Sequence, residues 1–142
     1  MSQTLALALS LMAWVVLLAA PVRAADPAIS LPGGTVAALM GSDLRLELVE
    51  VTDARCPTDV ACVWEGTIRL VIRIDRGGPA DQILVLCNTC DDGGRMATAA
   101  GYQFDLVGLE PAQKVIDALG RAPTVADYIG LVQITALSSQ AG

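Results

Sequence analysis

The chain has 142 residues, of which 54% are hydrophobic, and its 9 basic and 15 acidic residues give a net charge of −6. This length suits one domain with a single core, and the negative charge disfavours nucleic acid and anionic lipid as partners. The sequence contains no histidine, which excludes Ser-His-Asp and Cys-His catalysis and histidine-ligated zinc.

The N-terminal residues have the pattern of a signal peptide. Residues 5–20 are almost wholly apolar and uncharged, Pro21 ends the run, and Val22 to Ala24 offers small residues for cleavage. The run is short for a membrane span, which needs about 20 residues, but an uncleaved anchor stays an alternative. Cleavage after residue 24 predicts a periplasmic or secreted protein without membrane contact.

Beyond the leader, short apolar segments are separated by glycine and proline. Residues 25–34 are predicted to be a leading arm, and residues 35–40 a first strand. Apolar and charged residues alternate from Leu44 to Leu48, and the phase shifts at Val49, which predicts a strand with a bulge.

The clearest strand follows at residues 67–75, where apolar side chains occupy every even position. A Gly-Gly-Pro turn comes after it, so residues 82–87 are expected to pair back as a hairpin. Residues 90–94 are predicted to be a loop.

The C-terminal third is predicted to hold two more strands, at residues 101–110 and 128–137. Between them, a proline at the start and a glycine at the end of residues 111–120 indicate a short helix or turn. Residues 138–142 are expected to be a mobile tail. The aromatic residues predicted to lie in the core are Trp64, Tyr102, Phe104 and Tyr128.

These elements predict an all-β fold: an antiparallel β-sandwich or small barrel of six or seven strands, with one short helix or turn. The single β-domain is expected to span residues 35–137. Disulfide bonds are expected to staple it, because exported domains keep their cysteines oxidised.

Cys56 and Cys62 are predicted to pair and to close a small ring. Ring closure stabilises the fold by about 2 kcal/mol on the loop-entropy model. The ring would hold Pro57 to Ala61 as a rigid projection. Trp64 is predicted to plug the core, because it shares the inward phase of the strand that follows.

Asp53 and Arg55 flank this ring. They could contact an anion or a partner, but the favoured interpretation is structural: Asp53 accepts hydrogen bonds from turn amides, and Arg55 pairs with a carboxylate. The residues of the candidate binding loop are Asp53, Arg55, Pro57, Thr58 and Asp59.

Cys87 and Cys90 form a C-x-x-C sequence for which a structural loop disulfide is favoured. Thiol redox chemistry needs a helix N-terminus to lower a thiol pKa, whereas two aspartates and two glycines follow here. Zinc bound by all four cysteines is an alternative, and crossed pairings stay open because four cysteines allow three connectivities.

No metal site, cofactor or catalytic pair is predicted. Asp91 and Asp92, with Asp59, are a weak alternative for calcium, but the alternating aspartates of a helical calcium loop are missing. Glu47, Glu50, Glu65 and Glu110 fall at solvent-facing strand positions or at strand ends, and the sequence places no two of them to act as acid and base. The sequence therefore does not indicate an enzyme.

The residues Asp53, Arg55, Cys56, Pro57, Val60, Cys62, Trp64 and Gly66 resemble a D-[SA]-R-C-P-x-x-V-x-C-x-W-x-G signature. This signature is found in an uncharacterised family of small exported bacterial proteins. The resemblance, which extends loosely over residues 41–137, implies a secreted β-domain and no activity. Ala54 and Glu65 depart from the usual residues of the signature, and the pair of Cys87 and Cys90 is not part of it.

The function expected from these features is non-catalytic binding of an unknown protein or small molecule in the cell envelope. Three alternatives remain open. The chain could be a protease or hydrolase inhibitor that presents residues 57–61, a redox or metal-handling protein that uses Cys87 and Cys90, or a structural envelope component.

Overall fold

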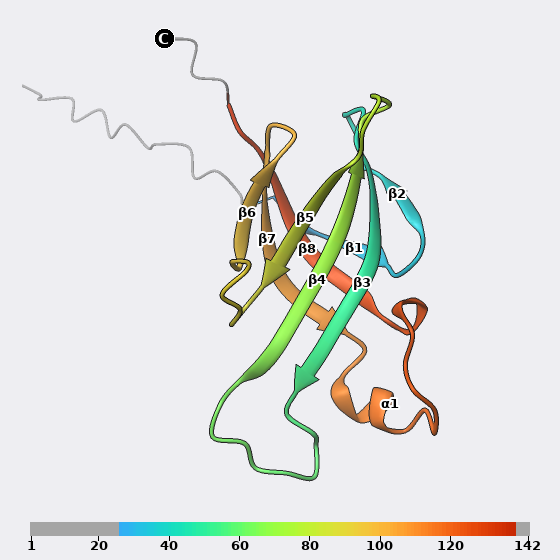
Figure 1. Cartoon of the computed structure of the whole chain (residues 1–142), viewed down its shortest axis with the longest axis vertical. Helices are drawn as coiled ribbons and strands as arrows, with labels where there is room; N and C mark the ends of the chain where they lie inside the picture. Colours follow the sequence, from blue (N-terminus) through green and yellow to red (C-terminus); the bar gives the residue numbers. More distant parts are fainter. Residues whose placement is uncertain (1–25, 139–142) are drawn as a thin grey trace, which may run out of the picture.

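A computed structural model describes residues 26–138 as two four-stranded antiparallel sheets that pack face to face (Figure 1). One sheet has the order β1-β8-β7-β6 and the other β2-β3-β4-β5. The strands are β1 (Ala28–Pro32), β2 (Val36–Ala38), β3 (Arg45–Arg55), β4 (Gly66–Asp75), β5 (Gln82–Cys87), β6 (Met96–Ala99), β7 (Tyr102–Glu110) and β8 (Ile129–Ala136). A short helix, α1 (Gln113–Asp117), and a 3-10 turn, η1 (Val125–Asp127), lie between β7 and β8. The predicted antiparallel β-sandwich is confirmed.

The core fills the space between the two sheets with side chains from alternate positions. In β4, Leu70, Ile72 and Ile74 are at most 1% exposed, which confirms the predicted inward phase of this strand. Phe104 and Tyr128 are buried as predicted, and Tyr102 is half-buried against the core.

The hairpin of β4 and β5 and the bulge in β3 are also confirmed. Strand β5 pairs antiparallel with β4 from Gln82 to Cys87, the range expected from the sequence. The β3–β4 register shifts between Leu48 and Glu50, so Val49 is the extra residue that turns the apolar phase.

Two strands were not expected. Strand β1 lies within the predicted leading arm, pairs with β8 over its whole length and buries Leu31 completely. The prolines around it masked the pattern, but a proline is compatible with an edge strand because its missing N–H faces outward. Strand β6 is four residues of methionine, alanine and threonine, too short and too weakly apolar to stand out.

Isolated bridges to loop residues and short outermost strands lie at the edges of the two sheets. Gly94 forms an isolated parallel bridge to Leu86 and accepts a hydrogen bond from the amide of Cys87, which covers the C-terminal end of the outer edge of β5. A second parallel bridge joins Gly33 to Leu48. The outermost strands β2 and β6 have 3 and 4 residues, and β1 ends at Pro32. Because β2 pairs only with Arg45 to Glu47, the later part of β3 also lies at a sheet edge.

The predicted signal peptide (1–24) and residues 139–142 of the predicted tail lie outside the described residues. Between residues 26 and 138, none of the helical segments has the length and apolar character that a membrane crossing requires.

Candidate functional site

The long connection between β3 and β4 extends beyond both sheets at one end of the sandwich (Figure 1). A disulfide between Cys56 and Cys62, with Cα atoms 5.9 Å apart, closes its base. The amide of Val60 donates to the carbonyl of Pro57 at 3.3 Å, which adds a turn inside the ring. The predicted ring is therefore present, and residues 57–61 are all exposed on it.

Gly66 returns the chain from this connection into β4. It has a φ of +83°, and a Cβ at this position would lie 2.7 Å from the carbonyl oxygen of Ala54. Only glycine adopts this conformation and close approach without strain. This conformation explains why the signature has a glycine at position 66.

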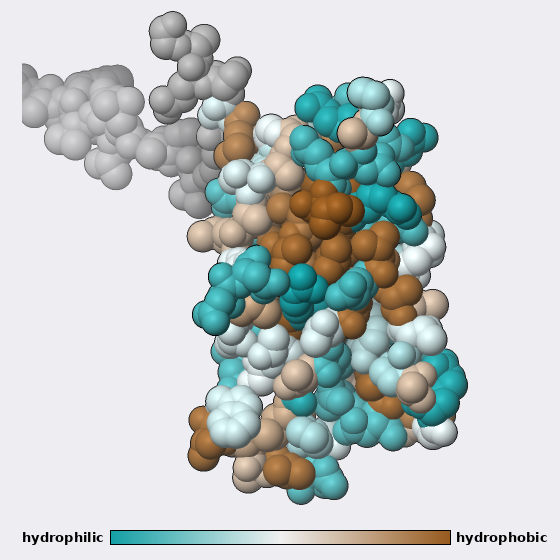
Figure 2. Space-filling view, viewed as in Figure 1, coloured by the Kyte–Doolittle hydropathy of each residue, from teal (hydrophilic) through white to brown (hydrophobic). Residues whose placement is uncertain are grey.

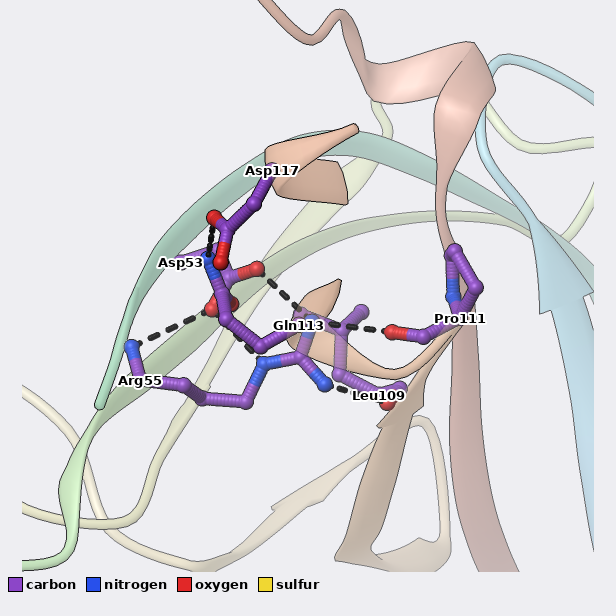
Figure 3. A network of polar contacts seen from close by, with 6 residues as sticks. All are labelled: Asp53, Arg55, Leu109, Pro111, Gln113 and Asp117. Atoms are coloured by element: carbon purple, nitrogen blue, oxygen red, sulfur yellow. Dashed lines mark hydrogen bonds and ion pairs between the residues drawn. The ribbon is translucent and has the colours of Figure 1, made fainter. Parts of the chain in front are cut away.

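Asp53 and Arg55 tie the end of β3 to the segment that follows β7 (Figure 3). The Arg55 guanidinium donates to both carboxylate oxygens of Asp53 at 2.7 Å, and also to the carbonyl oxygens of Leu109 and Pro111 at 3.0 Å. The Arg55 amide donates to Asp53 at 3.2 Å. The side chains are 2% exposed for Asp53 and 17% for Arg55.

This network fixes the charge state of Asp53. Burial alone would raise the pKa of the Asp53 carboxyl, but the hydrogen bonds and positive charge of Arg55 outweigh burial and hold that pKa below its ordinary value. Burial and the nearby Asp53 carboxylate in turn raise the pKa of the Tyr128 hydroxyl. Asp53 and Arg55 therefore belong to the framework beneath the loop, in agreement with the structural interpretation, and their polar groups are occupied within the fold.

Next to this network, α1 packs with Ile116 buried. Gln113 donates to Asp117 at 2.9 Å, and its Oε1 atom is buried without a hydrogen-bond donor among the described residues (Figure 3). Helix α1 and the β3–β4 connection thus share one end of the molecule, linked through Arg55.

The predicted burial of Trp64 is wrong. Its side chain is 72% exposed, and its apolar neighbours Val63 and Val60 are 92% and 54% exposed. The alternation of β4 does not extend back to Trp64, because the strand begins at Gly66 and the positive φ of this glycine breaks the phase. We call residues 57–65, which carry these three side chains, the apolar tip.

The second pair, Cys87 and Cys90, also forms a disulfide, with Cα atoms 5.6 Å apart. This pairing contradicts both the crossed connectivities and the four-cysteine zinc site. Asn88 fastens the loop to β4, since its side chain accepts from the amide of Ile68 at 2.8 Å and donates to the carbonyl of Gly66 at 3.0 Å. Cys87 itself is 1% exposed.

The aspartates after this disulfide do not gather into a metal site. Asp92 pairs with Arg69, while Asp91 is exposed. Over residues 26–138, no three histidine, cysteine, aspartate or glutamate side chains are placed to hold a metal ion together.

A surface pocket of about 220 Å³ lies on the outer face of the β2-β3-β4-β5 sheet. Four of its charged residues are already paired across strands, Arg45 with Asp75 and Arg73 with Glu47, and the fifth is Asp81. It therefore offers a ligand no unpaired arginine.

Sequence reasoning missed Val60 and Val63 as site residues. The available signal was that Val60 lies inside the disulfide ring and Val63 lies just after it, so neither belongs to a strand whose alternation would predict burial. Comparison of the chain with protein-family models, with curated proteins and with solved structures finds no match in any of the three.

Proposed function

We propose that this protein is a non-catalytic binding module that docks onto a partner with the apolar tip. The observation that carries the proposal is the exposure of three large apolar side chains, Trp64, Val63 and Val60, on one short connection between two strands. Exposed tryptophan is enriched at the energetic centres of protein interfaces. An isolated exposed apolar residue needs no explanation, but a group of this kind marks an interaction site.

The construction beneath the tip supports the same function. The Cys56–Cys62 disulfide restricts the loop, and the buried Asp53–Arg55 pair anchors its N-terminal side to the other sheet. A loop that is already ordered loses little conformational entropy on binding. This framework stiffens the tip without placing a reactive group in it.

The two disulfides fit an oxidising compartment. Together with the leader pattern of residues 1–24 and the resemblance of residues 53–66 to small exported bacterial proteins, they support a periplasmic or secreted location. The partner is then expected in the cell envelope or outside the cell.

The test compares affinity capture from envelope extract by the wild-type protein and by Trp64→Ala. Ile83→Ala is the matched control, because Ile83 is 62% exposed on β5, outside the tip. A protein captured by the wild type and by Ile83→Ala, but at least tenfold less by Trp64→Ala, is the expected result. Equal capture by all three proteins would remove the proposal.

Inhibition of a protease or hydrolase is a second candidate function. Residues 57–61 are all exposed on the disulfide-closed ring, which is how a rigid inhibitory loop is presented. Assay of the protein against a panel of periplasmic and secreted proteases tests it. If no enzyme of the panel is inhibited, this candidate is dropped.

A further inference from the structure

The charges around the apolar tip identify the chemistry of its partner, and this step rests on the proposed function. Each arginine between residues 26 and 138 forms an ion pair with a carboxylate: Arg45, Arg55, Arg69, Arg73, Arg76, Arg95 and Arg121. The net negative charge of the chain is therefore left on the acidic residues that no arginine neutralises.

These acidic residues are not evenly spread. The carboxylates without an ion pair in the described part of the chain are Asp26, Asp59, Glu65, Asp81, Asp91, Glu110 and Asp117. Asp59 and Glu65 belong to the apolar tip, while Glu110 and Asp117 lie at the end of β7 and in α1. Figure 1 shows α1 and the β3–β4 connection at the same end of the sandwich.

No cation balances these groups within the tip. Between Arg55 and Arg69 the sequence contains no lysine or arginine. Arg55 itself turns back into the fold, where it pairs with Asp53 and donates to the carbonyls of Leu109 and Pro111. Lys114 in α1 is the one lysine of the described residues, so this end of the molecule has one basic residue without an ion pair against two such carboxylates outside the tip, Glu110 and Asp117.

Figure 2, in the same view, shows a second apolar area over the middle of the sheet formed by β4 and β5. Exposed Ile83 contributes to that face. Its neighbouring charged positions are paired across the strands, Arg45 with Asp75, Arg73 with Glu47 and Arg69 with Glu50. The tip differs from this face because both of its carboxylates, Asp59 and Glu65, are unpaired and it contains no basic residue, whereas this face has three ion pairs beside one unpaired carboxylate, Asp81.

We propose that the apolar tip binds a basic protein segment, in which lysine or arginine alternates with aliphatic side chains. Val60 and Val63 offer apolar contact, and the indole face of Trp64 attracts a cation placed above it. Asp59 and Glu65 supply the complementary negative rim, which raises the rate of encounter and selects the sign of the partner. An anionic bilayer or polysaccharide is repelled by the same rim.

The experiment selects a phage-displayed library of random twelve-residue peptides on the immobilised full chain, with parallel selection on Trp64→Ala. Peptides of net positive charge that contain aliphatic residues are expected to be enriched on the wild type and not on Trp64→Ala. The best peptide is then titrated against Asp59→Asn/Glu65→Gln, whose affinity is expected to fall about fivefold at low salt.

The matched control is Asp26→Asn/Asp81→Asn, which removes the same number of charges from unpaired carboxylates outside the tip. Its affinity is expected to stay within about twofold of the wild type. A fall as large as that of the tip variant would mean that overall charge, and not the tip, attracts the peptide, and would overturn the inference.

The other outcomes separate the two levels of the proposal. If the enriched peptides depend on Trp64 but are neutral or acidic, the inference of a basic partner is overturned. The proposed binding function of the tip is then still supported. Binding of the wild type, but not of Trp64→Ala, to phosphatidylcholine vesicles without peptide enrichment would assign the tip to a lipid surface and overturn the inference. No Trp64-dependent binding of either kind would overturn both.

Discussion

Replacement of Asp53 by asparagine tests whether the Asp53–Arg55 network holds the base of the tip. The carboxylate is almost fully buried and Arg55 is mostly buried, with exposures of 2% and 17%. Loss of one partner from a buried ion pair costs about 3 to 5 kcal/mol, because the other charge is left uncompensated. Arg55 keeps its bonds to the carbonyls of Leu109 and Pro111, so Asp53→Asn is expected to lose about 3 kcal/mol of unfolding free energy.

Urea denaturation followed by circular dichroism measures this loss, as a lower midpoint with an unchanged slope. Glu50→Gln is the matched control. Its carboxylate is 61% exposed and also pairs with an arginine, Arg69, so it is expected to lose less than about 1 kcal/mol. A loss below about 1 kcal/mol for Asp53→Asn, with an unchanged slope, would refute the reasoning.

The same network predicts acid sensitivity. The pKa of Asp53 in the folded protein lies below its ordinary value of 3.8, since Arg55 outweighs the effect of burial. The stabilisation from ionised Asp53 is therefore complete above that ordinary value and is lost as the pH falls through the lower folded-state value. The urea midpoint of the wild type should fall more steeply below pH 4 than that of Asp53→Asn, whose side chain does not titrate.

Three further predictions concern the tip, its disulfide and the close approach of Gly33 to η1. Trp64→Ala should leave the unfolding free energy within about 0.5 kcal/mol of the wild type, because the side chain is 72% exposed; a loss of several kcal/mol in urea would mean that Trp64 packs into the core. Cys56→Ser/Cys62→Ser should lower the same free energy by about 2 kcal/mol through loop entropy, and no change in the urea midpoint would contradict this. Gly33→Ala should lower the unfolding free energy by about 3 kcal/mol, because its Cβ would lie 1.8 Å from a carbonyl oxygen of η1. Gly78→Ala is the control, since a Cβ there has nothing within 4 Å, and it should melt at the wild-type temperature. Equal melting temperatures of the two variants would argue against the close approach of Gly33 to η1.

Local patterns predicted much of the sandwich, because strand β4 alternates without interruption and a short turn joins it to the apolar run of β5. Strand β1 escaped prediction because its pairing with β8 joins residues far apart in the sequence, such as Ile29 and Val132. The burial of Trp64 was predicted wrongly because the positive φ of Gly66 resets the phase. Periodicity describes a strand only while its backbone conformation continues.

The candidate site was predictable in part. The ring and its exposed residues followed from the two cysteines, and a structural role for Asp53 and Arg55 followed from turn chemistry. The acceptors of Arg55 could not be foreseen, since the carbonyls of Leu109 and Pro111 lie 54 and 56 residues away in the sequence. Backbone acceptors carry no residue-type signal, so contacts of this kind appear only once the fold is known.

The short edge strands of both sheets affect how readily this protein aggregates at high concentration. A free, flat strand recruits another chain by backbone hydrogen bonding, and this is the usual start of fibre growth. Here Gly94 bridges the C-terminal end of the edge at β5, and the outermost strands β1, β2 and β6 have three to five residues, one of which ends in proline. In the folded protein a second chain can therefore pair only with these short strands and with the uncovered parts of β3 and β5, which limits the template for polymerisation.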